Sequence, residues 1–270
     1  MKSIFKKISS IALASALCVT MASCKSSSSS TDKLDAIKKA GVLVVGTSAD
    51  YPPFEFHKQQ NGQDKIMGAD VEIAEQIAKK IGVKIQWQDM DFDGLLPALQ
   101  SGKIDMIIAG MIDTPEREKA VDFSHKYYLS TDQAIIRKDD LSKYSKLSDL
   151  SGKHIGVQLG TTQQDDMKKW LPSGDYVALG KDTDLILELK SKKVDAVILE
   201  EPIVKAYVSQ NSDLVTANIS FPKATQGPAV AVQKGNDKEF LSTINSVVDG
   251  LVSSKKVDNW VAQYTTLSEK

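Results

Sequence analysis

Two kinds of apolar pattern alternate along the first half of the chain. Short unbroken or alternating apolar runs are followed by segments whose apolar residues have helical spacing. The order they predict is a strand over 42–46, a helix over 70–81, a strand over 83–87, a helix over 93–100 and a strand over 104–109. Asp70 is suited to cap the first helix and Gly82 to end it. This strand–helix–strand rhythm predicts a parallel sheet covered by helices.

The same rhythm returns in the second half. The expected elements are a strand over 153–157, helices over 161–170 and 182–190, and a strand over 194–199. The two halves also share a sequence motif, because Leu99-Gln-Ser-Gly-Lys-Ile-Asp105 is similar to Leu189-Lys-Ser-Lys-Lys-Val-Asp195. Since only two copies occur, we expect two similar α/β lobes rather than a solenoid of repeats.

Two extended segments, 131–137 and 224–232, are candidates to cross between the lobes. The tail from Asp237 has helical spacing and would then return to the first lobe. The predicted boundaries are 34–131 with 226–270 for lobe 1, and 132–225 for lobe 2, with hinge strands at its borders. A cleft between lobes joined in this way suits a small ligand and hinge closure.

The N-terminal residues predict export. Three lysines precede an apolar stretch over 8–22 that is too short to span a bilayer, so we predict a signal peptide over 1–23. Met21-Ala22-Ser23-Cys24 is similar to the lipobox of bacterial lipoproteins, in which the cysteine carries lipid. Residues 24–33 would then be a lipidated Cys24 and a Ser-rich tether. We expect anchoring to the outer face of the cell membrane, or a periplasmic location; a secreted protein with a chance cysteine is the alternative.

Composition argues against several other classes of protein. Removal of a signal peptide with three lysines and no acid changes the formal charge from −1 to about −4, and no long basic tract occurs, so we expect no nucleic-acid binding. The two cysteines leave only Cys24 after export, which predicts no internal disulfide. Three histidines, far apart in sequence, predict no metal site.

Arg117 is the first candidate for chemistry. Thr114 is a good helix N-cap and Pro115 a good first helical residue, so Arg117 would lie in the first turn, where a cation opposes the helix dipole. A guanidinium in that position calls for an anionic partner, and its planar fork suits a carboxylate. The alternative is a surface arginine paired with Glu116, Glu118 or Asp122.

Two segments of the second half add groups of complementary charge. A strand leads through Gly160 to a helix start at Thr161 or Thr162, whose free N–H groups suit a carboxylate, although simple capping by threonine is the alternative. Glu200 or Glu201 follows an apolar strand, at the end where open α/β sheets bind ligands, and suits a ligand ammonium. Exposure to solvent before Pro202 is the alternative.

Aromatic residues supply a possible slot for a ligand side chain. Tyr51, Phe54, Phe56 and Phe92 are the candidates, of which we expect at least two to be core. Together the sites bind a carboxylate, an ammonium and an apolar or cationic side chain, and they include no nucleophile–base pair. This set fits a zwitterionic ligand better than a reaction.

Three motifs carry a resemblance to a known family. Residues 47–56, 90–99 and 109–124 resemble those of the polar amino acid-binding proteins of ABC importers, the family-3 solute-binding proteins, and the likeness extends from about Leu34 to Tyr264. It implies a two-lobed periplasmic-binding-protein fold of type II, with a mixed, mostly parallel sheet flanked by helices in each lobe. It also implies a monomer without cofactor or enzyme activity that binds a free L-amino acid and delivers it to a membrane permease and ATPase.

The resemblance assigns roles to individual residues. Arg117 is similar to the arginine that grips the ligand carboxylate, Gly110 to the residue whose carbonyl accepts from the ammonium, and Thr162 to a backbone donor from lobe 2. Glu200 takes the position of an aspartate that pairs with the ammonium, and Tyr51 and Phe92 the positions that sandwich the side chain. The remaining expected ligand-binding residues are Ser48, Ala109, Ile112, Gln158 and Thr161. Ile112 replaces the usual Thr or Ser, which removes one hydrogen bond worth ~1 kcal/mol.

The sequence leaves the ligand open. Ser48 and Gln158 are neutral and favour glutamine, whereas a basic ligand needs an acid at its side-chain end, for which Glu55, Asp91 and Asp93 are candidates. Segments 158–161 and 199–202 resemble arginine-type members, so arginine and glutamine lead. Two rival functions are an amino acid-sensing or adhesion lipoprotein, and a dehydratase on the same fold with Glu200 as its acid or base.

Overall fold

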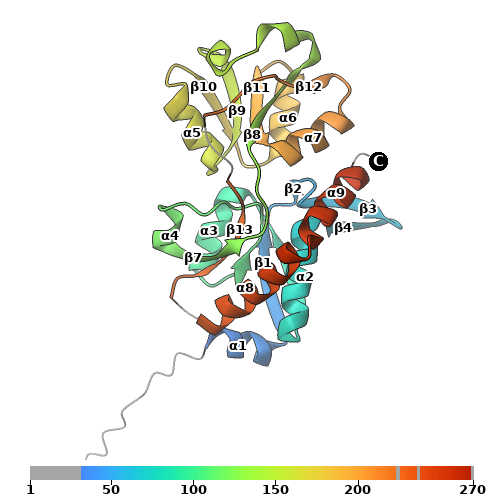
Figure 1. The fold of residues 1–270 in the computed structure, drawn as a ribbon, viewed down its shortest axis with the longest axis vertical. Coiled ribbons are helices and arrows are strands. Elements are labelled where there is room, and N and C mark those ends of the chain that lie inside the picture. The colour runs from blue at the N-terminus through green and yellow to red at the C-terminus, as the bar shows by residue number, and fades with distance from the viewer. Residues whose placement is uncertain (1–31, 223–225, 236–237, 269–270) are drawn as a thin grey trace, which may run out of the picture. The chain divides into compact units, whose positions relative to one another are not determined.

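The computed structural model describes residues 32–222, 226–235 and 238–268 (Figure 1). The predicted signal peptide, Cys24 and most of the predicted tether lie outside the described residues. Two five-stranded sheets organise the described chain. We call the parts built around them lobe 1 and lobe 2, and we keep the boundaries predicted from the sequence as a working division.

The sheet of lobe 1 has the order β5-β1-β6-β13-β7. Its strands are β1 (Val42–Thr47), β5 (Lys84–Asp89), β6 (Met106–Ile107), β7 (Val121–Lys126) and β13 (Ala229–Gln233). The first three pair in parallel, whereas β13 is antiparallel to both β6 and β7. All strands except β13 therefore run in one direction, which is the mixed, mostly parallel sheet that was predicted.

The sheet of lobe 2 repeats this plan with the order β10-β9-β11-β8-β12. Its strands are β8 (Asp132–Arg137), β9 (His154–Gln158), β10 (Asp175–Leu179), β11 (Ala196–Glu200) and β12 (Leu214–Thr216). Here β8 is the strand that runs against the others. Just before β8, Ser130 and Gln226 exchange two backbone hydrogen bonds of 2.8 and 2.9 Å, so the two segments that connect the sheets are joined to each other.

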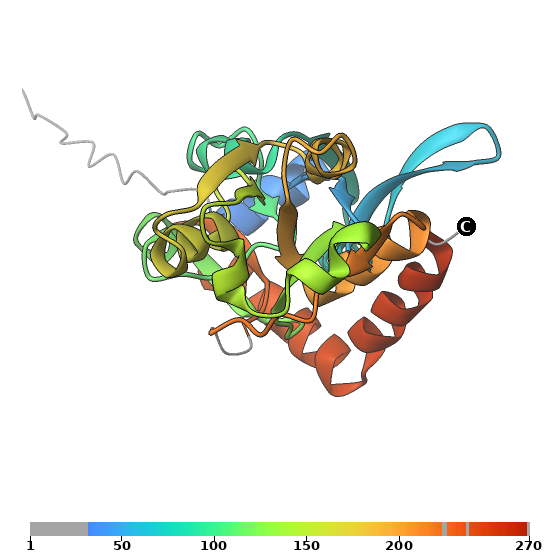
Figure 2. The same cartoon turned by 90° about the horizontal axis from the view of Figure 1, so that it is seen from above.

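A third, antiparallel sheet was missed by the sequence patterns. It contains β2 (Asp50–Tyr51), β3 (Glu55–Gln60) and β4 (Gln63–Met67), and Figure 2 shows the β3–β4 hairpin reaching away from the helices. Asn61 and Gly62 form its turn with φ of 54° and 77°. The Asn-Gly pair is the usual signal for such a hairpin and would have identified it.

Helices cover the sheets. They are α1 (Lys33–Ala40), α2 (Ala69–Ile81), α3 (Phe92–Gln100), α4 (Arg117–Ala120), α5 (Thr162–Trp170), α6 (Asp182–Lys190), α7 (Glu201–Gln210), α8 (Lys238–Ser253) and α9 (Lys256–Ser268), with short 3₁₀ helices at Lys138–Lys143 and Leu147–Leu150. Helix α9 packs on α2 and α8 of lobe 1 and also on α7 of lobe 2. None of the helices described is both long and apolar enough to cross a membrane.

The prediction that Asp70 caps α2 is wrong. The helix starts at Ala69 with Gly68 at the N-cap, and Asp70 is buried inside the first turn. The chain enters through glycine because a Cβ on residue 68 would lie 2.0 Å from the carbonyl oxygen of Phe54. Gly82 ends the helix in the left-handed conformation, as predicted.

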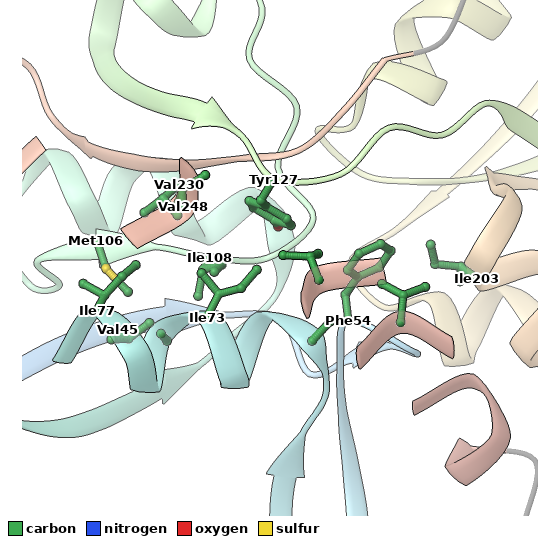
Figure 3. Packing of buried hydrophobic residues seen from close by; sticks show 14 of the residues in the cluster. Val45, Phe54, Ile73, Ile77, Met106, Ile108, Tyr127, Ile203, Val230 and Val248 are labelled. Carbon is green, nitrogen blue, oxygen red and sulfur yellow. The ribbon is translucent and has the colours of Figure 1, made fainter. Parts of the chain in front are cut away.

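The largest hydrophobic core connects both lobes. It runs from Val45, Ile77 and Met106 under the first sheet to Phe54 and to Ile203 of α7 (Figure 3). Tyr51 at the end of β2 and Glu200 at the end of β11 line the same cavity. This packing positions the cavity described next.

Candidate functional site

One cavity brings together every residue that the sequence analysis expected to bind a ligand. Its lining is Ser48, Tyr51, Glu55, Phe92, Ala109, Gly110, Ile112, Arg117, Gln158, Thr161, Thr162, Gln163 and Glu200. The space measures about 320 Å³, solvent at the mouth included. That is at the lower end of the ~300–1,000 Å³ of small-molecule sites. Much of the lining follows the C-terminal ends of β1, β6, β9 and β11, where open α/β sheets bind ligands.

Arg117 lines this cavity with a cation that no described carboxylate contacts in a salt bridge, although the charge of Asp165 acts on it. Its Nη1 donates to the carbonyl oxygen of Ile112 at 2.6 Å, and its Nη2 to that of Gly160, in lobe 2, at 2.9 Å. The guanidinium also lies 5.5 Å from the centre of the Phe92 ring, and burial lowers its pKa to about 10. Across the described ranges it forms no salt bridge, so several of its N–H donors remain for a ligand.

The surface-pair alternative for Arg117 is therefore wrong. Glu116 pairs with Lys119, Asp122 pairs with Lys234, and Glu118 is exposed. The predicted helix start is wrong as well, because α4 begins at Arg117 itself and is only four residues long. Thr114 still makes a capping contact, since its Oγ1 accepts from the N–H of Arg117 at 3.2 Å.

Glu200 is fully buried at the end of β11, which contradicts the solvent-exposed alternative. Ser130 donates to its Oε2 at 2.9 Å. Its neighbour Glu201 lies outside the cavity and pairs with Lys205 instead. The strand therefore presents one carboxyl group, that of Glu200, to the cavity.

A second buried carboxyl group, that of Glu55, lines the same cavity. Burial and the neighbouring Asp70 raise the pKa of Glu55 well above its usual value. Of the three acids expected at the side-chain end, this one reaches the cavity. Asp91 and Asp93 do not, because both are exposed and lie against Gly180 and Gly160 at the meeting of the lobes.

The aromatic residues divide as expected. Phe54 and Phe56 are core, while Tyr51 and Phe92 line the cavity. Gly110 lies beside Tyr51 with φ of 57°, and a Cβ there would lie 2.7 Å from the ring atom Cε1 of Tyr51. Glycine at this position therefore permits both the left-handed turn after β6 and the close approach of the ring.

The turn from β9 into α5 builds the lobe 2 wall. The helix starts at Thr162, one of the two predicted positions, and Thr161 is its N-cap, which is the role that the capping alternative gave it; its Oγ1 accepts from the N–H of Gln164. The side chain of Gln158 donates to the carbonyl of Gly180 at 3.2 Å. Gln163 was missed by the sequence analysis, although it is buried in the wall and donates to Asp132 at 2.8 Å. Its place in the first turn of a helix that begins at the cavity was the signal.

Further contacts join the lobes beside the cavity. Lys181 Nζ donates to the carbonyl of Met90 at 3.2 Å and to Ser48 Oγ at 3.4 Å. The N–H of Asp182 donates to the Asp50 carboxylate, and the Tyr207 hydroxyl donates to the Asp50 carbonyl at 2.6 Å. The lobes are thus held closed over the cavity. The residues described contain no cluster of His, Cys, Asp and Glu that could hold a metal ion.

Comparison with known proteins places this geometry in a family. The chain is 37% identical over 254 residues to the arginine-binding extracellular protein ArtP of Bacillus subtilis, covering 93% of this chain and 95% of that protein. It is 38% identical over 226 residues to a probable histidine-binding protein of Campylobacter jejuni, with 82% and 84% covered.

Solved structures agree. The amino acid ABC transporter substrate-binding protein AbpA of Streptococcus pneumoniae, solved with L-arginine bound, superposes with a TM-score of 0.85 at 38% identity, covering 87% of this chain and 99% of that one. Residues 43–266 match the family profile itself. The chain therefore belongs to the bacterial extracellular solute-binding proteins, family 3.

Proposed function

We propose that the protein captures a free cationic amino acid, L-arginine foremost, between its lobes and delivers it to an ABC importer. The observation that carries the proposal is the charge inside the cavity. One guanidinium without a carboxylate partner, that of Arg117, and two buried carboxyl groups, those of Glu55 and Glu200, line the same small space. L-arginine presents one carboxylate and two cations, the exact complement in number and sign of these three groups.

The residue roles follow from this arrangement. The Arg117 fork would bind the α-carboxylate together with the N–H of Thr162, and Glu200 would bind the α-ammonium. Tyr51 and Phe92 would contact the side chain, and a guanidinium stacks well on such rings. Closure would then add lobe 2 contacts that the open form lacks, which is the differential binding a ligand needs to favour the closed state.

Glu55 distinguishes arginine from glutamine. A glutamine amide brings no charge to the side-chain end, whereas a guanidinium brings a cation and several N–H donors to a buried carboxyl group. A buried carboxylate without donors is costly, so the cavity favours the ligand that supplies both. Arginine bound to related proteins supports the same choice.

Delivery to a permease and ATPase, export, and anchoring through Cys24 belong to the same proposal, and they are supported by family membership and by the N-terminal sequence. We propose a binding role without catalysis, in which Glu200 forms an ion pair. Ser130 donates to the Glu200 carboxylate at 2.9 Å, which favours the ionised form that an ion pair needs.

A thermal-shift screen of ligand-free protein against the twenty amino acids tests the proposal. A ligand at a thousandfold its Kd stabilises the folded state by ~4 kcal/mol, which gives a clear rise in Tm. We expect the largest rise with arginine, a smaller one with lysine or histidine, and little with glutamine. A dominant response to glutamine, or none to any amino acid, would refute the ligand assignment.

A further inference from the structure

Two carboxyl groups meet at the floor of the cavity. Glu55 begins β3, and Asp70 lies in the first turn of α2; both side chains are fully buried. Asp70 accepts from the N–H of Gly110 at 3.0 Å and from the hydroxyl of Tyr127 at 2.7 Å. Neither oxygen of Glu55 has a hydrogen-bond partner among the described residues, and the charge of the neighbouring Asp70 acts on its carboxyl group.

Two neighbouring buried carboxyl groups repel each other when both are ionised, which favours a proton on one of them. The donors decide where that proton lies. Asp70 receives two donors and is stabilised as the anion, whereas Glu55 receives none and is stabilised as the neutral acid. The pKa directions agree, because burial raises the pKa of Asp70 only to about 6 while that of Glu55 is raised well above its ordinary value.

The other charges near Glu55 reinforce this state. Asp70, Asp50 of β2 and Asp182 of α6 all act on Glu55 and raise its pKa. Tyr51 and Tyr127 nearby are neutral, because burial and the charges of neighbouring acids, Glu200 and Glu55 among them, raise their pKa values. The two cations of the region are engaged elsewhere, Lys181 with Asp89 and Met90, and Arg117 with the carbonyls of Ile112 and Gly160.

We infer that Glu55 holds a proton while the cavity is empty and releases it when the cationic end of the ligand arrives, so that capture of a cationic amino acid is coupled to pH. The inference rests on the proposed function, since a guanidinium supplies the charge and the donors that Glu55 lacks. The released proton goes to solvent, and the Glu55 carboxylate pairs with the ligand. A neutral side chain such as that of glutamine leaves the proton in place.

Two measurements with L-arginine test the inference. Calorimetry in buffers of different ionisation enthalpy counts the protons released on binding, and we expect close to one per arginine near neutral pH. The Kd should then fall as the pH rises, by up to about tenfold for each pH unit below the raised pKa of Glu55 in the empty cavity, by linkage. Arginine that binds without proton release would overturn the inference but leave the proposed function standing; absence of arginine binding would overturn both.

The variant Glu55→Gln identifies the group responsible. Its amide is neutral and has nearly the shape of the carboxyl group, so we expect the variant to fold. It should release no proton from residue 55 on binding and lose most of its preference for arginine over glutamine. Asp50 and Asp182 lie on opposite lobes, and they can take up or release protons when the lobes close. That exchange also occurs in the variant, so the difference in proton release between wild type and Glu55→Gln belongs to Glu55 alone. Proton release unchanged in Glu55→Gln would overturn the assignment.

Infrared difference spectra cover the case in which the variant binds too weakly for calorimetry. Ligand-free wild type should show a carbonyl band of a protonated carboxylic acid that ligand-free Glu55→Gln lacks, and this band should vanish from wild type when arginine is added. A band from buried Asp182, whose pKa is also raised well above its usual value, is common to both proteins and cancels in the difference. Glu75→Gln, an exposed replacement on α2, is the matched control and should behave as wild type. Ligand-free spectra of wild type and Glu55→Gln that do not differ in this band would contradict the inference.

Discussion

Replacement of Arg117 by alanine tests the centre of the proposed site. The side chain reaches across the cavity mouth, donating to Ile112 in its own lobe and to Gly160 in lobe 2. Its removal would leave the ligand carboxylate buried without a cation. Removing one partner of a buried charge pair costs about 2–5 kcal/mol, and the lower part of that range applies because Arg117 is only half-buried.

The lost hydrogen bond to Gly160 adds about 1 kcal/mol against the closed form. At ~1.4 kcal/mol for each factor of ten, we expect the Kd for L-arginine to rise by about 100- to 1,000-fold. The unfolding free energy of the ligand-free protein should stay the same or increase, because a guanidinium without an anionic partner is itself costly to bury. Loss of affinity without loss of stability is the signature of a binding residue.

Isothermal calorimetry measures the affinity, and thermal unfolding without ligand measures the stability. Arg117→Lys should recover part of the affinity, since it keeps the charge but not the two-pronged geometry. Lys119→Ala is the matched control, an exposed cation two residues along the same short helix. An unchanged Kd in folded Arg117→Ala would refute the reasoning and remove Arg117 from the site.

Three further predictions follow from the structure and the sequence. Gly110→Ala should lower the affinity for arginine more than the stability, because the new Cβ would displace the Tyr51 ring. Gly152→Ala is the control: its φ of 69° is similar, no other described residue would lie within 4 Å of its Cβ, and its affinity should not change. Equal losses of arginine affinity in the two variants, measured by calorimetry, would contradict this prediction. Lys181→Met should weaken binding by about 3- to 10-fold and make ligand-free protein more open in small-angle scattering, whereas Lys193→Met, which loses a contact within lobe 2, should do neither. Cys24→Ser should abolish labelling by radioactive fatty acid and release the protein from membranes; a labelled variant would show that another residue is lipidated.

Much of the fold could be predicted because it depends on local patterns. The period of apolar residues indicates α2, α5, α6 and α8, and Gly82 ends α2 as its conformation requires. The residues expected to bind a ligand could be named because their motifs are short and contiguous, and they all reached one cavity. The β3–β4 hairpin was predictable too, from Asn61 and Gly62, but its signal was not used.

Only the tertiary structure decided which distant groups meet. Asp70 looks like a helix cap in sequence, yet packing of Gly68 against Phe54 buries it beside Glu55. Whether Glu55, Asp91 or Asp93 reaches the ligand depends on how lobe 2 covers lobe 1. The period of apolar side chains predicts helices and strands because these elements depend on residues that are close in sequence. The protonation and pairing of buried groups depend instead on burial, which segments distant in sequence create together.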